Sequence, residues 1–155
     1  MIECEQDNPK LGFVGKIKKV DTDIVQNFIK SDFIPVIAPI GFGIKGETFN
    51  INGDTAAGAI ASSLLADRLL LLTDVVGVKD SEDQLISQLT IEEAKNLIDT
   101  GIINSGMIPK VNTSIKAIEE GVRASVIIDG RVDHACLLEL FTSHGVGTLF
   151  KKTFD

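Results

Sequence analysis

The stretch Arg68–Thr73 constrains the fold more than any other part of the sequence, because it contains four consecutive leucines. It is an apolar run of strand length without any alternation between apolar and polar residues. Strands of this kind are buried on both faces, as in parallel sheets that helices cover on both sides. The run therefore predicts an α/β protein with a mostly parallel sheet.

Segments typical of strands and of helices alternate along the rest of the chain. We expect strands at 14–20, 33–38, 48–51, 124–128 and 148–150, and helices at 21–30, 55–66, 91–100, 108–120 and 136–141. The apolar run 33–38 favours a buried strand, and 148–150 a closing edge strand. The pattern predicts a three-layer sandwich, with residues 1–155 in one domain and an irregular segment at 1–12.

Composition and charge exclude several classes of function. The formal net charge of the 155 residues is -7, which argues against a nucleic-acid surface. No apolar run reaches the roughly 18 residues of a membrane span, and the acidic N-terminus does not resemble a signal peptide. Cys4 and Cys136 are interpreted as free thiols of a cytoplasmic protein. His134 and His144 lack metal-ligand spacing, so we expect no protein-bound metal.

The segment Gly41–Gly46 fits the pattern G-x-G-x-x-G after an expected strand. A dinucleotide-binding fingerprint must also open a helix, whose N-terminus holds the pyrophosphate. The residues that follow, 47–52, are typical of a strand. We therefore predict a glycine-rich hairpin or loop here.

Three polar side chains, those of Asn50, Asn52 and Asp54, stand where an extended segment meets a helix. Alternation with Phe49 and Ile51 directs both asparagine side chains to the same, outer face. Two interpretations remain open. Asn52, Asp54 or Thr55 could simply be the N-cap of the helix. Alternatively, the polar side chains could bind a ligand at a strand-to-helix junction.

Lys110 lies in the first turn of an expected helix, after Ser105, Gly106 and Pro109. A cation at this end faces the positive pole of the helix dipole, which costs about 0.3–1 kcal/mol. A bound phosphate reverses that cost. The alternative is a lysine that extends away into solvent.

The loop after the leucine-rich strand contains Asp74, Gly77 and Lys79. Loops at the carboxyl ends of such strands bind ligands, and glycine permits close approach of the backbone. The alternative is an ordinary exit from a strand.

These segments together resemble the amino acid kinase family, and within it the branch that phosphorylates N-acetyl-L-glutamate. The matching stretches are Asn50-Ile-Asn52-Gly-Asp54, Leu71-Leu-Thr-Asp74-Val-Val-Gly77-Val, Gly101-Ile-Ile-Asn-Ser-Gly106-Met-Ile-Pro-Lys110-Val and Gly145-Val-Gly-Thr148. Their order and spacing match over nearly the whole chain. Other members, such as aspartokinases and carbamate kinases, fit these stretches less well.

The resemblance implies an ATP-dependent phosphotransferase with a carboxyl acceptor, in arginine biosynthesis, that uses ATP with Mg²⁺ carried by the nucleotide. Lys110 would neutralise the transferring phosphoryl group, and Asp54 would hold catalytic lysines in place. Asn50 and Asn52 would bind acetylglutamate. The residues implied in ATP binding are Asp74, Val75, Val76, Gly77, Val78, Lys79, Ile102, Ile103 and Asn104.

The resemblance also implies a candidate site for arginine as an inhibitor, near His134, Glu139 and Gly145, for which a plain amphipathic helix is the alternative. It corresponds to the family's C-terminal half, so that the N-terminal half, with a second catalytic lysine, is missing in cis or in trans. We expect the parent enzyme to be a homo-oligomer and this chain alone to turn over little. The alternatives are a non-catalytic nucleotide- or arginine-binding fragment and another kinase of the same fold.

Overall fold

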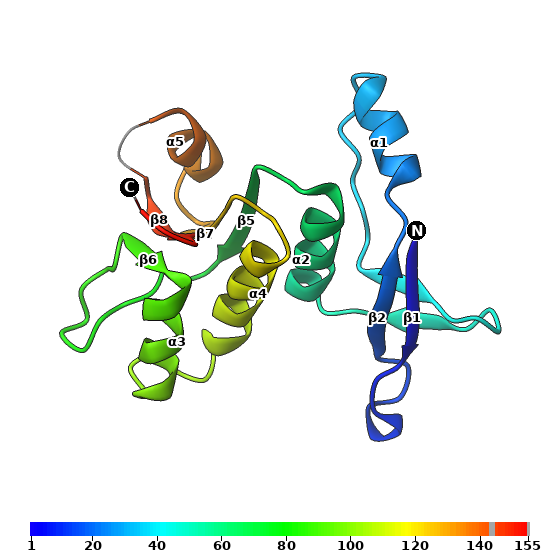
Figure 1. Ribbon diagram of the computed structural model, residues 1–155, viewed down its shortest axis with the longest axis horizontal. Coiled ribbons are helices and arrows are strands. Elements are labelled where there is room, and N and C mark those ends of the chain that lie inside the picture. The colour runs from blue at the N-terminus through cyan, green and yellow to red at the C-terminus, as the bar shows by residue number, and fades with distance from the viewer. Residues whose placement is uncertain (143–144, 155) are drawn as a thin grey trace. The chain divides into compact units, whose positions relative to one another are not determined.

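The computed structural model describes residues 1–142 and 145–154. The chain divides into two compact units, Met1–Leu64 and Leu65–Asp155. The sequence predicted one domain, so the observed organisation differs from that prediction. Each unit is built around its own four-stranded sheet (Figure 1).

Unit 1 contains a mixed sheet of strand order β2-β1-β3-β4. Strand β1 pairs antiparallel with β2 and parallel with β3, and β3 pairs antiparallel with β4. Its elements are β1 (Ile2–Gln6), a 3-10 helix (Pro9–Leu11), β2 (Gly15–Val20), α1 (Asp23–Lys30), β3 (Ile40–Phe42), β4 (Thr48–Asn50) and α2 (Gly53–Leu64).

The first strand corrects the prediction that residues 1–12 are irregular. Ile2 and Cys4 point into the core of unit 1 and are 1% and 4% exposed, while Glu3 lies between them on the other face. Burial raises the pKa of the Cys4 thiol, and the neighbouring Glu3 carboxylate adds to that shift. Only two residues of this strand point inward, so the alternation of apolar and polar residues is too short to predict a strand from the sequence.

The predicted buried strand at 33–38 is absent. Ile34 is 92% exposed and Val36 is 97% exposed, and β3 begins only at Ile40. A run that is apolar on both faces needs neighbouring strands and cover on both sides. None of the described strands lies beside these residues.

The glycine-rich segment forms a hairpin, as the sequence predicted. Strands β3 and β4 pair antiparallel, and the Gly43 N–H donates to the Glu47 carbonyl oxygen over 2.7 Å. Gly46 adopts a φ of 87°, which favours glycine. No helix opens here, so the dinucleotide-fingerprint interpretation is excluded.

Unit 2 contains a second mixed sheet, of strand order β5-β7-β8-β6. Strands β5 and β7 are parallel, β7 and β8 are antiparallel, and β8 and β6 are parallel. Its elements are β5 (Arg68–Thr73), β6 (Gln88–Thr90), α3 (Ile91–Asp99), α4 (Ile108–Glu119), β7 (Ala124–Asp129), α5 (Ala135–Phe141) and β8 (Gly147–Lys151).

Helices cover both faces of the second sheet, which gives three layers. On one face, Val126 and Ile128 of β7 pack against Ala135 of α5. On the other face, the buried hydroxyls of Ser125 in β7 and Ser114 in α4 form a hydrogen bond of 2.8 Å. Helix α3 packs beside α4, on the side of the sheet opposite α5 (Figure 1).

The α/β class and the parallel pairing of the leucine-rich strand are confirmed, and two of the three strand pairs in its sheet are parallel. The predicted closing strand exists as β8, but it lies between β7 and β6 and not at an edge. The reason is that the three-residue strand β6, which the sequence did not predict, pairs with its free side.

None of the helices in the described residues is long and apolar enough to cross a membrane. His144, which lacks metal-ligand spacing in the sequence, lies outside the described residues.

Candidate functional site

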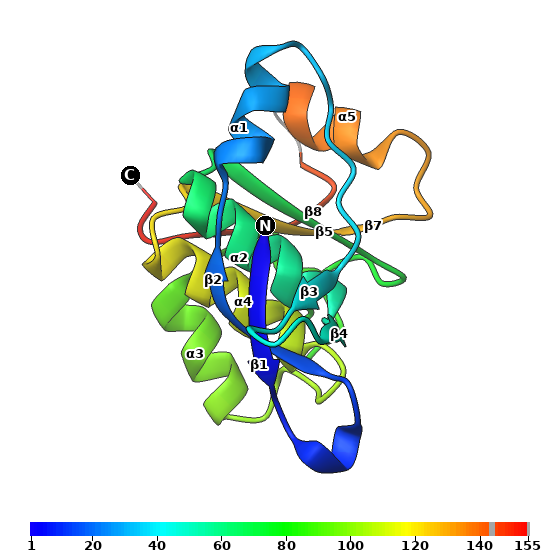
Figure 2. The same cartoon turned by 90° about the vertical axis from the view of Figure 1, so that its right-hand side faces the viewer.

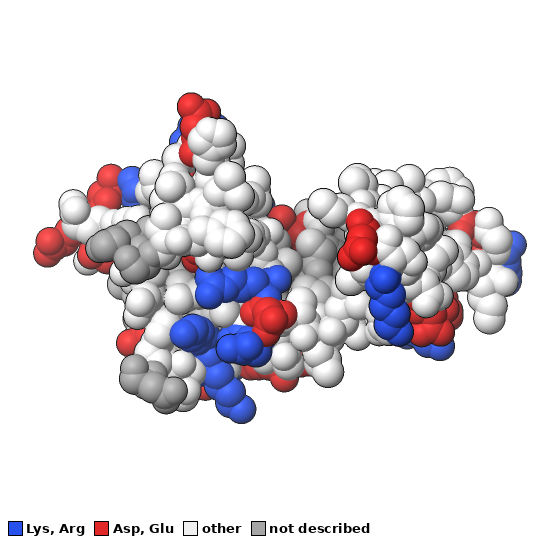
Figure 3. All heavy atoms as spheres, turned by 90° about the horizontal axis from the view of Figure 1, so that it is seen from above, with Lys and Arg blue, Asp and Glu red and all other residues white. Residues whose placement is uncertain are grey.

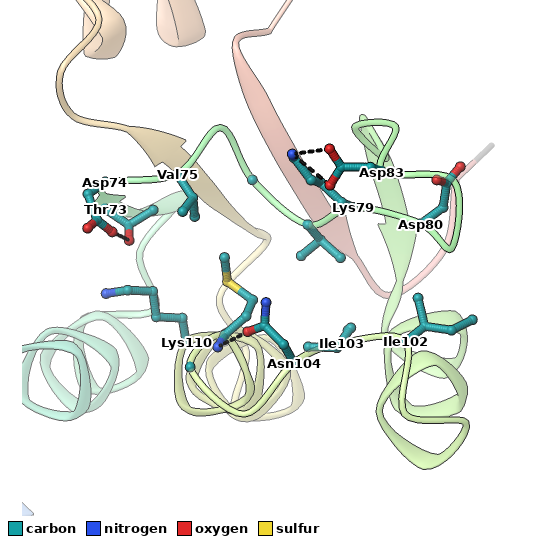
Figure 4. A pocket seen from close by; sticks show the side chains of 14 residues that line it. Thr73, Asp74, Val75, Lys79, Asp80, Asp83, Ile102, Ile103, Asn104 and Lys110 are labelled. Atoms are coloured by element: carbon teal, nitrogen blue, oxygen red, sulfur yellow. Dashed lines mark hydrogen bonds and ion pairs between the residues drawn. The ribbon is translucent and has the colours of Figure 1, made fainter.

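A pocket of about 430 Å³ opens in unit 2 just after the carboxyl end of β5 (Figure 4). Two segments line it: the loop that follows β5, and the connection from α3 into the first turn of α4. Its lining residues are Thr73, Asp74, Val75, Gly77, Val78, Lys79, Asp80, Asp83, Ile102, Ile103, Asn104, Gly106, Met107 and Lys110.

The structure brings most of the predicted nucleotide residues together around this pocket. Eight of the nine line it, and Val76 is the exception, with a side chain that is 39% exposed. Sequence reasoning did not assign Thr73, Asp80, Asp83, Gly106 or Met107 to the site. Each of them lies next to or within a predicted segment, so extending those segments by a few residues finds them.

A buried threonine in β8, a strand of the same sheet, anchors the loop after β5. The Thr148 hydroxyl of β8 accepts from the Val78 N–H over 2.8 Å and donates to the Ile86 carbonyl oxygen over 2.7 Å. Gly77 has a φ of 142°, and a Cβ at this position would lie 2.6 Å from the Thr148 hydroxyl oxygen. Only glycine therefore lets the loop approach β8 this closely.

Lys110 stands at one end of the pocket. It occupies the first turn of α4, with Pro109 before it, as the sequence predicted. Its side chain is half-buried and extends into the space beneath Thr73 and Asp74 (Figure 4). The alternative of a lysine directed away into solvent is thus not what the structure shows.

The opposite end of the pocket carries a second lysine and two carboxylates (Figure 4). The Lys79 amine contacts both carboxylate oxygens of Asp83, at 2.8 and 2.9 Å. Asp80 shapes the turn, because its Oδ1 accepts from the backbone N–H groups of Glu82 and Gln84. Charged groups of both signs therefore lie at this end.

The floor of the pocket is the link between α3 and α4. The Leu97 carbonyl oxygen accepts from the N–H groups of Ile102 and Ile103, which ends α3. The Asn104 side chain accepts from the Met107 N–H over 3.1 Å and so sets the start of α4. These bonds hold the amino end of α4 facing the pocket.

In unit 1, the structure brings Asn50, Asn52 and Asp54 together at the junction of β4 and α2. Phe49 and Ile51 are 4% and 2% exposed, and both asparagines are exposed on the other face, as predicted. The Asn52 Oδ1 accepts from the backbone N–H of the helix's third residue over 3.1 Å. Asn52 therefore caps α2, which the sequence had left as one of two interpretations.

Of the candidate effector residues, Glu139 and Gly145 lie side by side. Glu139 is 7% exposed, and its carboxylate accepts from the Val146 N–H over 3.2 Å and pairs with Arg68 at 3.3 Å. A Cβ on Gly145 would lie 2.5 Å from the Glu139 Oε2. His134 is exposed and stands at the opposite end of α5, with a φ of 61°.

An ion pair that the sequence did not indicate lies at the carboxyl ends of β5 and β7, the end of the sheet where the pocket opens. Asp129 ends β7 opposite Thr73 and pairs with Arg131 through contacts of 2.8 and 2.9 Å. Hydrogen bonds from the Arg131 guanidinium, and then from its backbone N–H, lower the pKa of Asp129 to about 2. In the part of the chain that the structure describes, no group of three histidine, cysteine or acidic side chains could hold a metal ion.

Comparison with known proteins identifies the class to which this fold and pocket belong. The sequence model described as "Amino acid kinase family" matches residues 1–129. The chain therefore belongs to the amino acid kinase family.

Within the family, the chain is similar to acetylglutamate kinases. It is 55% identical over 152 residues to the enzyme of Dinoroseobacter shibae, covering 98% of this chain and 53% of the relative. It is 53% identical over 154 residues to that of Paracoccus denitrificans, covering 99% and 51%. The chain thus spans about half the length of these relatives.

Solved structures have the same fold. The N-acetylglutamate synthase of Neisseria gonorrhoeae, in complex with coenzyme A and L-arginine, superposes with a TM-score of 0.87 at 31% identity, over 92% of this chain and 33% of that one. The carbamate kinase of Giardia lamblia bound to AMP-PNP superposes with a TM-score of 0.68, over 90% and 47%. At 21% identity, the second likeness concerns the fold alone.

Proposed function

We propose that this chain is the nucleotide-binding part of an enzyme that transfers the γ-phosphoryl group of ATP to the side-chain carboxylate of N-acetyl-L-glutamate, in arginine biosynthesis. The observation that carries the proposal is the convergence of the loop after β5, the α3–α4 link and Lys110 on one pocket. The similarity to acetylglutamate kinases supports the choice of acceptor.

In this proposal, the triphosphate lies at the Lys110 end of the pocket. The amino end of α4 and the Lys110 ammonium both present positive charge there, and a phosphate satisfies the two together. The nucleoside lies toward Ile102 and Ile103, which offer apolar contacts at the other end. ATP is taken as its Mg²⁺ complex, with the metal carried by the phosphates.

The chemistry requires no general base in this chain, because the acceptor carboxylate is already ionised at neutral pH. Catalysis then consists of positioning and of stabilising the charge on the transferring phosphoryl group. Lys110 supplies such charge. Asp54 is proposed to orient catalytic lysines through charge-assisted hydrogen bonds.

Asn50 and Asn52 are proposed to bind the acetylglutamate. The Oδ1 of Asn52 already accepts hydrogen bonds from Thr55, so its amide NH₂ is the group that remains for a ligand. An NH₂ group donates to carboxylate or carbonyl oxygens, which acetylglutamate offers. Capping of α2 and substrate binding are thus compatible roles for this one side chain.

Arginine is proposed as an inhibitor that binds near Glu139 and Gly145, with His134 at the start of the same helix. The support is that the Glu139 carboxylate already receives a guanidinium, that of Arg68. The gonococcal synthase of the same fold was crystallised with L-arginine. Titration with arginine tests this part separately from the nucleotide site.

We also propose that turnover requires polypeptide equivalent to the half of the relatives that this chain does not match. The complete enzyme is proposed to be a homo-oligomer and to act in the cytoplasm. The chain by itself is then expected to bind nucleotide and to form little acyl phosphate. Titration calorimetry with ATP and Mg²⁺, followed by hydroxamate trapping of any acyl phosphate, tests both statements. Binding of arginine with no binding of ATP would favour a non-catalytic arginine-binding module.

A further inference from the structure

Unit 1 carries an apolar groove of about 590 Å³ between α1 and the segment 33–40. Every residue that lines it is apolar. Val25 is 3% exposed and lies at its base, while Phe28 and Phe33 meet edge to face with ring centroids 6.2 Å apart. Figure 2 shows α1 and the strand-free stretch that leads from it into β3.

Several residues of the segment beside the groove lack both side-chain cover and backbone hydrogen-bond partners. Ile34 and Val36 are 92% and 97% exposed. Among the backbone hydrogen bonds of the described residues, none involves Ile34, Val36 or Ile37. The face drawn in Figure 3 shows that charged side chains occupy only a few places on unit 1, and uncharged atoms cover the rest.

Exposure of this extent differs from that of a scattered surface residue. Single exposed apolar side chains are ordinary, whereas a continuous apolar patch marks an interaction surface. Unpaired N–H and C=O groups in an extended, apolar segment add the means to pair with another strand. The segment therefore has the side chains and backbone groups of a β-strand whose neighbouring strands would come from another polypeptide segment.

The direction of pairing follows from the neighbouring strands. The Pro39 carbonyl oxygen accepts from the Ile51 N–H over 2.9 Å, so odd-numbered residues face the β4 side. Continuing this alternation back along the chain directs the N–H groups of Ile34 and Val36 to the opposite edge. Pro35 removes a donor only from the β4 side, so the N–H groups of Ile34 and Val36 remain on the opposite edge.

We propose that residues 33–38 become a strand when polypeptide equivalent to the unmatched half of the acetylglutamate kinase relatives docks on this groove. Those relatives contain about as much chain again outside the matched region. A run that is apolar on both faces needs a neighbouring strand and helical cover together, which half of an α/β fold supplies. A second copy of this chain would offer only the same uncovered apolar run, and so would not provide both a neighbouring strand and helical cover.

The inference rests on the proposed need for a second half of the fold, and not on the nucleotide pocket of unit 2. The test is co-expression of the full chain with a tagged fragment of the Dinoroseobacter shibae enzyme that comprises the part outside the match. Co-purification is compared for the wild-type chain, the double variant Ile34→Asp/Val36→Asp and the control Ile44→Asp. Ile44 is 91% exposed but lies in the β3–β4 turn, outside the groove.

We expect the tagged fragment to retain the wild-type chain and the control variant, and to lose at least 90% of the double variant. In the complex, the amides of Ile34 and Val36 should exchange with deuterium at least tenfold more slowly than in the free chain. Circular dichroism and ATP titration of the double variant verify that it is folded. Retention of a folded double variant, failure to retain the wild type, or a self-dimer that the double variant abolishes would each overturn the proposal.

Discussion

The buried hydroxyl of Thr148 accepts a hydrogen bond from the Val78 N–H over 2.8 Å and thereby ties the loop after β5 to the strand β8. These two residues are 70 positions apart in the sequence. The contact fixes the backbone on the side of the pocket where Gly77 approaches β8 most closely. The hydroxyl of a residue that does not itself line the pocket thus helps to set the shape of the candidate nucleotide site.

Thr148→Val should lower the free energy of unfolding by about 1–3 kcal/mol, because valine leaves the buried Val78 N–H without its acceptor. It should also weaken ATP binding by loosening the loop. Chemical denaturation and calorimetry measure the two effects. Thr148→Ser, which keeps the hydroxyl, is the control, and equal losses in both variants would show that packing and not the hydrogen bond is responsible.

Substitutions of Asn52 separate helix capping from substrate binding. Asn52→Ala should destabilise the chain by about 0.5–2 kcal/mol through loss of the cap on α2. Asn52→Asp retains a capping oxygen and should be nearly as stable as the wild type, but it replaces the NH₂ donor with a negative charge.

In an enzyme completed with the unmatched half, the aspartate variant is therefore expected to raise the KM for acetylglutamate at least tenfold. Steady-state kinetics of the hydroxamate assay measure this change. A normal KM for Asn52→Asp would assign the side chain to capping alone.

The Asp129–Arg131 pair predicts a loss of stability in acid. The pKa of Asp129 is about 2 in the folded chain, below its ordinary value of 3.8. The folded state therefore favours the ionised carboxylate, so that this stabilisation is complete above about pH 5 and is lost as the pH falls through 4 toward 2.

Asp129→Asn should accordingly flatten the dependence of stability on pH between 4 and 2. Urea unfolding at a series of pH values measures it. Asp67→Asn is the matched control, because Asp67 pairs with Arg123 on the surface with both side chains 81% exposed. If Asp67→Asn flattened the dependence of stability on pH between 4 and 2 more than Asp129→Asn does, the loss of stability in acid could not be assigned to the Asp129–Arg131 pair.

The parts of the fold that the sequence predicted correctly are those whose signals are local. The leucine run of β5 predicted a strand in parallel pairing, although Leu69 and Leu71 are buried and Leu72 is 50% exposed. Thr90 with Glu93 forms the capping box that opens α3. Among the polar residues of the pocket, Asp74, Lys79 and Lys110 were found because they follow a buried strand or open a helix.

The parts that were missed depend on distant partners. Strands β1 and β6 exist through pairing with β2 and β8, and their own patterns are too short to reveal them. The segment 33–38 shows the reverse, since its local pattern predicts a strand but the described residues provide no neighbour for it. Thr148 contributes through two hydrogen bonds to the loop after β5, which no sequence spacing reveals.

The most direct test of the account is calorimetric titration of ATP with Mg²⁺, and of adenosine, into the wild-type chain, Lys110→Ala and the control Lys116→Ala in the last turn of the same helix. If Lys110 contacts the phosphates, Lys110→Ala should weaken ATP binding at least tenfold, or about 1.4 kcal/mol. Adenosine binding and the control should remain unchanged. Equal ATP affinity in all three proteins would contradict the assignment of this pocket to the nucleotide's phosphates.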